Sequence, residues 1–370
     1  MNKDFYIDTE DKFNEFIKKA KQQNAIALDT EFLWRRTYYP VLGLIQAAFS
    51  RDECYLIDTI AIKDISAFSE ILTDKNIVKI LHDAIQDLQI ISKACNDVIP
   101  VNIFDTRRAA GFASLDPTIS LAKLIEKLFD VLLPKSETNT DWTARPLTEN
   151  QKEYAIDDVI YMCEMREKII NKATQNGFNE WLNAEMEIYE DAKIYENILP
   201  NERFLKVKGI NKLSPEQMRV AKGLAEWRDI QAEKRDIPKT FVFKDSVLLQ
   251  IIYKNPQTMQ DVQRIKDIHP ATVRKFGSGI LKVVQKSTDS DENMKWVQKK
   301  LKSNHKNNDA LKDMKTFIAE KAEELGIAPE LLATRSELNQ LLDDRKNNNL
   351  DKNPLLQTWR KEIFSEIVKL

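Results

Sequence analysis

The sequence has little of several features that mark particular classes of protein. It holds no run of about 18 apolar residues, the length that crosses a bilayer as a helix, so we expect no membrane span. Its first residues lack the long apolar core of a signal peptide, so we expect no secretion signal. No tandem repeat of fixed period is visible. The hydrophobic fraction of 42% is close to that of a globular protein.

Cysteine and histidine are scarce. The cysteines are scattered and show no CxxC spacing: Cys54, Cys95 and Cys163. Such an odd, sparse count predicts reduced thiols and a cytoplasmic location. The histidines show no metal-ligand spacing: His82, His269 and His305. A histidine-based metal site is therefore not expected, and His82 is interpreted as a local hydrogen-bonding residue.

The net charge is small over the whole chain but unevenly distributed along it. The net charge is only −2 over 370 residues, a length that predicts two or three domains. Residues 1–200 carry a net −11, whereas residues 201–370 carry +9, of which +8 falls within 201–290. An acidic half followed by a basic segment fits a cation-requiring site beside a module that binds a polyanion.

The first half of the sequence alternates between strand and helix patterns. Apolar runs predict strands at 25–29, 41–49, 54–58 and 77–81, and amphipathic patterns predict helices at 11–21 and 85–94. This alternation indicates an α/β fold, with a mixed sheet flanked by helices. After about residue 105 the pattern is wholly helical. Capping boxes at Thr148–Gln151 and Ser214–Gln217 predict two helix starts. Residues 197–201 and two polar stretches, 286–293 and 302–309, interrupt the helices.

The first candidate for chemistry is the pair Asp29 and Glu31, near the end of a predicted strand. Side chains at i and i+2 of a strand project to one face, so the two carboxylates would stand side by side. Two carboxylates this close raise each other's pKa unless a cation lies between them. Oxygen ligands favour Mg²⁺ or Mn²⁺ as that cation. The pair alone is weak, because similar pairs occur in many solvated loops.

Two further stretches carry acids at helical spacing. Tyr154 and Asp158 are four residues apart in a capped helix and share a face, so the phenol could orient a water beside the carboxylate. Asp83 and Asp87 follow a strand and open a helix, and spacing alone does not choose between them. Acids from several elements predict two-metal phosphodiester hydrolysis, in which a pair of divalent ions about 4 Å apart stabilises the attacking and leaving oxygens.

Taken together, these stretches closely resemble the ribonuclease D family of the DEDD exonuclease superfamily, in the subclass with a tyrosine in its third motif. The resemblance covers roughly residues 20–165 and rests on 28–32 (LDTEF), 38–46 (YYPVLGLIQ), Leu81-His82, 86–88 (QDL), 104–106 (FDT), 141–147 (DWTARPL), Tyr154 and Asp158-Val159. It implies a ribonuclease H-like fold and four metal-binding acids: Asp29, Glu31, Asp87 and Asp158. It also implies that Tyr154 positions the attacking water, and it favours Asp87 over Asp83. Asp105 matches a family position that is not a metal ligand, and we interpret it as a helix N-cap or structural residue.

Residues 210–285 resemble the helicase-and-RNase-D C-terminal (HRDC) domain, a small helical bundle, and 331–339 with 358–360 resemble the third domain of ribonuclease D. We therefore expect an exonuclease domain at 1–200, an HRDC domain at 208–288 and an HRDC-like helical domain at 294–370. Aromatic and basic side chains are candidates for RNA contacts through stacking and phosphate pairing. They are Phe32, Arg35, Arg145, Arg274, Lys275 and Lys282.

The resemblance implies a 3′→5′ exoribonuclease that trims structured RNA, chiefly tRNA precursors, and releases nucleoside 5′-monophosphates. Two divalent ions, Mg²⁺ or Mn²⁺, would be required, RNA would be the partner, and a monomer is favoured. A DNA 3′→5′ exonuclease is the nearest alternative, because nothing in the sequence identifies a group that senses the 2′-hydroxyl. A non-catalytic RNA-binding protein is the alternative of a different class, although all four acids are present.

Overall fold

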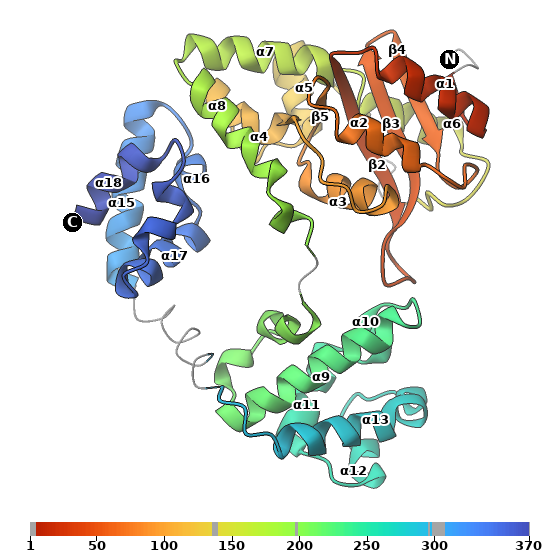
Figure 1. The fold of residues 1–370 in the computed structure, drawn as a ribbon, viewed down its shortest axis with the longest axis vertical. Coiled ribbons are helices and arrows are strands. Elements are labelled where there is room, and N and C mark those ends of the chain that lie inside the picture. The colour runs from red at the N-terminus through yellow and green to blue at the C-terminus, as the bar shows by residue number, and fades with distance from the viewer. Residues whose placement is uncertain (1–4, 135–139, 197–198, 295–296, 298–307, 370) are drawn as a thin grey trace. The chain divides into compact units, whose positions relative to one another are not determined.

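The computed structural model describes residues 5–134, 140–196, 199–294, 297 and 308–369. Contacts between Cα atoms divide the chain into two compact units (Figure 1). The first unit comprises Met1–Leu33, Val41–Glu196 and Asn308–Leu370. The second comprises Trp34–Pro40 and Asn197–Asn307. Each unit is described separately below.

The first unit is built on a six-stranded mixed sheet in the order β1-β4-β3-β2-β5-β6. The strands are β1 (Tyr6–Ile7), β2 (Ala25–Leu33), β3 (Val41–Ser50), β4 (Glu53–Asp58), β5 (Val78–Leu81) and β6 (Ile103–Asp105). β2, β3 and β4 pair antiparallel, whereas β1 pairs parallel with β4, and β5 pairs parallel with both β2 and β6. The mixed α/β sheet predicted from alternating patterns is confirmed.

Strand β2 lies in the interior of the sheet and carries the first acidic pair. Its residues Ile26–Leu28 are fully buried, which explains the continuous apolar run there. The strand continues to Leu33 beyond its predicted end near Asp29, because Phe32 and Leu33 pair with Leu42 and Val41 of β3. Glu31 pairs with Leu44 and Phe32 with Leu42, so Gly43 is the extra residue of a β-bulge.

Helices pack against this sheet, and the predicted helices at 11–21 and 85–94 are confirmed. The helices of this part are α1 (Glu10–Ala20), α2 (Ser69–Leu72), α3 (Ile85–Ala94), α4 (Thr106–Ala110), α5 (Leu121–Phe129), α6 (Glu149–Asp157), α7 (Met162–Gln175) and α8 (Asn179–Met186). α6 begins at the predicted capping box, in which the side chains of Thr148 and Gln151 satisfy each other's backbone N–H groups. α3 and α7 both contact β2, so the strand is covered by helices from different parts of the chain.

The C-terminal helices belong to the same unit as the sheet. They are α15 (Asn308–Leu325), α16 (Pro329–Leu332), α17 (Arg335–Lys346) and α18 (Lys361–Lys369). Leu331 and Phe364 are fully buried in the same hydrophobic core as Leu28 of β2. The buried Glu185 of α8 accepts hydrogen bonds from Arg108 of α4 and from Arg360, each at 2.7 Å. These ion pairs join the C-terminal segment to the rest of the unit in addition to the shared hydrophobic core. The division of the chain into three domains stays a prediction.

The second unit is helical and has a core of its own. Its helices are α9 (Pro215–Glu233), α10 (Lys239–Val242), α11 (Asp245–Lys254), α12 (Met259–Gln263) and α13 (Pro270–Thr288). α9 begins at the predicted capping box of Ser214 and Gln217, with Pro215 at the first position. α13 ends at Thr288, inside the predicted polar stretch 286–293. Of the other two predicted interruptions, residues 197–198 and 302–307 lie outside the described residues.

Among the described residues, no helix combines the length and the apolar character that a membrane span needs.

Candidate active site

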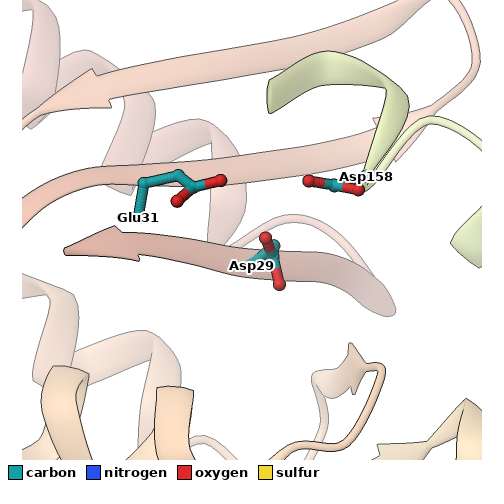
Figure 2. Close-up of side chains that lie close together, drawn as sticks. All are labelled: Asp29, Glu31 and Asp158. Atoms are coloured by element: carbon teal, nitrogen blue, oxygen red, sulfur yellow. The ribbon is translucent and has the colours of Figure 1, made fainter. Parts of the chain in front are cut away.

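Three carboxylates from two elements converge in the first unit. Asp29 and Glu31 project from one face of β2, as the i and i+2 spacing predicts. Asp158 caps the C-terminus of α6 and approaches them from the helix end. One oxygen of each residue lies within 4.8 Å of the others, and Figure 2 shows the carboxylates pointing toward one another. The fold therefore assembles acids that are about 130 residues apart in the sequence.

Tyr154 lies one helical turn before Asp158 on α6, and its hydroxyl opposes the rise in the pKa of the Asp158 carboxyl. Burial, together with the charges of Asp158, Glu31 and Asp29, raises the pKa of Tyr154 well above its usual value, so the phenol stays protonated. Its ring lies 6.0 Å from that of the buried Trp142, measured between centroids. The expected pairing of phenol and carboxylate on one helix face is present.

Asp87 stands slightly apart from the three converging acids. It lies in the first turn of α3, and its carboxylate accepts a hydrogen bond from the hydroxyl of Thr30. Thr30 is 5% exposed and lies on β2 between Asp29 and Glu31. Sequence reasoning did not single out Thr30, and the available signal was its position between the two acids on the strand.

Asp105 organises the turn that leads into α3. Its carboxylate accepts from the backbone N–H of Asp83 at 3.1 Å and of Ala84 at 2.9 Å. It also caps α4 by accepting from the backbone N–H groups of Arg107 and Arg108. The interpretation of Asp105 as an N-cap and structural residue is confirmed, and its contacts fix the start of the helix that carries Asp87.

The neighbours of Asp87 have other partners. Asp83 has a positive φ of 63° and forms an ion pair with Arg107 at the surface. The ring nitrogens of His82 lie 2.9 Å from the Thr106 hydroxyl and 3.1 Å from the Ile119 carbonyl oxygen. These contacts favour Asp87 over Asp83 for the site, and they give His82 the local hydrogen-bonding role that was expected.

The acids of the site resist ionisation in the absence of a cation. Burial is the largest cause, and it raises the pKa of Glu31 to about 8, of Asp158 to about 7 and of Asp87 to about 6. Burial and the charges of Asp87, Asp158 and Glu31 raise the pKa of Asp29 well above its usual range. The charged neighbours that add to these shifts are carboxylates in each case.

This donor set fits divalent metal ions. Buried charges are tolerated in proteins when they are paired or coordinate a metal. Oxygen-only ligands held close together suit hard cations such as Mg²⁺ and Mn²⁺. The carboxylates of Asp29, Glu31 and Asp158 supply this chemistry directly, and Asp87 supplies a fourth acid nearby.

The residues predicted to contact RNA are dispersed. Phe32 is half-buried on β2, and Arg35 is exposed in the second unit. Arg145 donates to both oxygens of the buried Asp58 at 2.6 Å and to the carbonyl oxygen of Gly43 at 2.7 Å, contacts that favour a structural role. Exposed basic residues of the second unit complete the set, all on α13: Arg274, Lys275 and Lys282. These RNA contacts stay predictions.

Comparisons with known proteins agree along the whole chain. Residues 5–174 match the family model described as a 3′-5′ exonuclease, 217–284 the HRDC domain, and 306–368 the C-terminal HRDC domain of ribonuclease D. The chain is 36% identical to ribonuclease D of Desulfotalea psychrophila, over 100% of this chain and 99% of that protein. It is 31% identical to ribonuclease D of Escherichia coli K12, over 97% and 96% respectively.

A solved structure resembles the whole fold. The crystal structure of Escherichia coli RNase D superimposes with a TM-score of 0.86 at 29% identity, covering 98% of this chain and 97% of that one. The fold and the acidic site define a nuclease, a hydrolase of phosphodiester bonds. The chain belongs to the ribonuclease D family, whose exonuclease and HRDC domains it shares. Membership of this family of DEDD exonucleases implies dependence on divalent metal ions.

Proposed function

We propose that the protein is a 3′→5′ exoribonuclease that trims the 3′ ends of structured RNA, chiefly tRNA precursors. The observation that carries this proposal is the convergence of Asp29, Glu31 and Asp158 within 4.8 Å, with each carboxyl pKa raised. The solved Escherichia coli relative is described as an exoribonuclease involved in structured RNA processing, which supports the same substrate class here.

The four acids would hold two divalent ions, Mg²⁺ or Mn²⁺. Asp29, Glu31 and Asp158 would hold the ion that binds the attacking water, Asp29 would also reach the second ion, and Asp87 would complete that one. When bound, the ions would lower the pKa of a water and stabilise the oxygens that attack and leave phosphorus. The Thr30 hydroxyl would keep the Asp87 carboxylate oriented for this role.

Tyr154 would orient the attacking water through its hydroxyl. The raised pKa of this phenol keeps its proton in place, so the side chain acts as a hydrogen-bond donor and does not take up the water's proton. Asp158 lies one turn further along the same helix, so the phenol and the acid stand beside each other. Attack on the last phosphodiester would then release a nucleoside 5′-monophosphate.

Further RNA contacts are proposed within each unit. Phe32, beside the acidic pair, and Arg35 are proposed to hold the RNA end. Arg274, Lys275 and Lys282 are proposed to contact phosphates, since they are exposed on the basic segment. The monomeric state and the cytoplasmic location stay predictions.

The test uses the full chain, a precursor tRNA labelled at its 3′-terminal nucleotide, and a DNA strand of matched sequence. We expect labelled nucleoside 5′-monophosphate from the RNA with Mg²⁺ or Mn²⁺ and none with a chelator. Asp29→Asn should abolish turnover and leave the fold intact, as judged by circular dichroism. Degradation that ignores the chelator, or retention of more than a few per cent of activity by this variant, would contradict the proposed site. Faster digestion of DNA would favour the DNA exonuclease alternative.

A further inference from the structure

Gln46 is the cross-strand neighbour of Asp29. The antiparallel register of β2 and β3 places Asp29 directly opposite Gln46, two positions along β3 from the pair of Leu44 and Glu31. Directly opposite residues of an antiparallel pair project to the same face, with Cβ atoms about 4.5–5.5 Å apart. The Gln46 side chain therefore stands beside the first acid of the site, on the face that carries the carboxylates.

The Gln46 amide is buried without a partner. The residue is 0% exposed, and among the described residues neither Oε1 nor Nε2 has a hydrogen-bond partner. A buried amide with no partner costs free energy, and an apolar side chain of the same size would avoid that cost. Such a group in a native core needs an explanation, and function at an adjacent site is one of the recognised explanations.

The neighbours of Gln46 limit which groups its amide can hydrogen-bond to. On β4 its register partner is the buried Leu56, so its neighbour on that side is apolar. Leu56 packs in one cluster with Leu44, Trp142 and Ala155, and Ala155 belongs to α6, the helix that carries Tyr154. On the other side stands the carboxylate of Asp29, which accepts but cannot donate when it is ionised. The amide thus lies between an apolar cluster and an acid.

We propose that Gln46 is a positioning residue for Asp29, and that its Nε2 donates a hydrogen bond to the Asp29 carboxylate when that carboxylate holds a divalent cation. This inference rests on the proposed function, because it assigns Asp29 to the metal site. A ligating carboxylate is ionised and is usually held by a second hydrogen-bond donor, which fixes its orientation. A neutral amide suits this place, because a lysine or arginine there would repel the cation that the acids attract.

The test compares Gln46→Met with the wild-type chain. Methionine keeps the length of the side chain and removes the amide, and Leu44→Met, on the same strand and face, is the matched control. Calorimetric titration with Mn²⁺ should show affinity weakened by about tenfold in Gln46→Met and unchanged in the control. The melting temperature in chelator should be equal to or above that of the wild type, since an unpartnered amide is lost. Turnover should fall with little change in the KM for RNA.

A structural role would give different results. Wild-type Mn²⁺ affinity in Gln46→Met, or a melting temperature in chelator that falls together with that of Leu44→Met, would overturn the inference. A crystal structure with Mn²⁺ should place Gln46 Nε2 about 2.9 Å from an Asp29 oxygen. Absence of Mn²⁺ binding by the wild type would overturn the proposed function as well, whereas normal binding with no effect of Gln46→Met would overturn this inference alone.

Discussion

Replacing Asp158 by asparagine should stabilise the metal-free protein while it abolishes catalysis. Burial raises the pKa of Asp158 from 3.8 to about 7, and the charges of Asp157 and Asp87 add to this. Between these two values the folded chain binds a proton that the unfolded chain has released, so stability falls as pH rises through this window. Three pKa units correspond to about 4 kcal/mol, an upper limit for the cost of the Asp158 charge at pH 8.

Asparagine keeps the shape of the side chain and carries no charge, so Asp158→Asn should recover part of that cost at pH 8. Near pH 4 the folded state is fully protonated and the unfolded state about half protonated, so the gain should fall below about 1 kcal/mol. Each kcal/mol corresponds to about 2–4 °C in melting temperature for a unit of this size. Urea unfolding and thermal melts in chelator at pH 4, 6 and 8 would measure the effect. Glu149→Gln, at an exposed acid of the same helix, is the control and should change stability by no more than about 0.5 kcal/mol.

Addition of Mn²⁺ should reverse the order of the two proteins. The wild type should gain stability because the ion binds the folded state alone, and Asp158→Asn should gain far less. The reasoning would be refuted by a variant that is no more stable than the wild type at pH 8 in chelator. A gain of equal size at pH 4 and pH 8 would refute it too, because the stabilisation would then have nothing to do with ionisation.

Three further changes test other contacts. Burial raises the pKa of Asp87 to about 6, and the hydrogen bond from Thr30 opposes a further rise. Thr30→Val should therefore raise this pKa and move the acid limb of the pH–activity profile to higher pH. An unmoved limb would contradict this. A Cβ on Gly43 would lie 2.4 Å from the Trp142 carbonyl oxygen. Gly43→Ala should therefore lower the free energy of unfolding in urea by about 1–3 kcal/mol. An unchanged urea midpoint would count against this close approach of the two backbones. Lys282→Ala should reduce the slope of log affinity for RNA against log salt by about 1, measured by fluorescence anisotropy, whereas an equal slope would remove this residue from the interface.

Sequence patterns predicted the parts of the site that depend on local geometry. The period of a strand placed Asp29 and Glu31 on one face, and the period of a capped helix placed Tyr154 beside Asp158. Both predictions use only residues within one element, where backbone geometry fixes the direction of each side chain. The choice of Asp87 came from the family resemblance, and the hydrogen bond from Thr30 agrees with it.

The contacts between distant elements could not be predicted in this way. Nothing in the local pattern of α8 shows that Glu185 is buried between Arg108 and Arg360, which lie 77 residues before it and 175 after it. The sequence also made Arg145 a candidate for RNA contact, whereas in the fold its guanidinium donates to the buried Asp58. Such partners depend on which elements meet in space, and hydrophobic periodicity leaves that open.

The composition around β2 follows from the burial of its acids. A strand with neighbours on both edges and helices packed against it has little access to water, so each carboxylate on it needs a cation or a hydrogen-bond donor. Two side chains beside these acids can donate hydrogen bonds, and both are neutral. They are Thr30 within the strand and Gln46 opposite Asp29. Neutral donors can orient acids without cancelling their charge, and under the proposed function the uncancelled charge would attract divalent ions to this place in the fold.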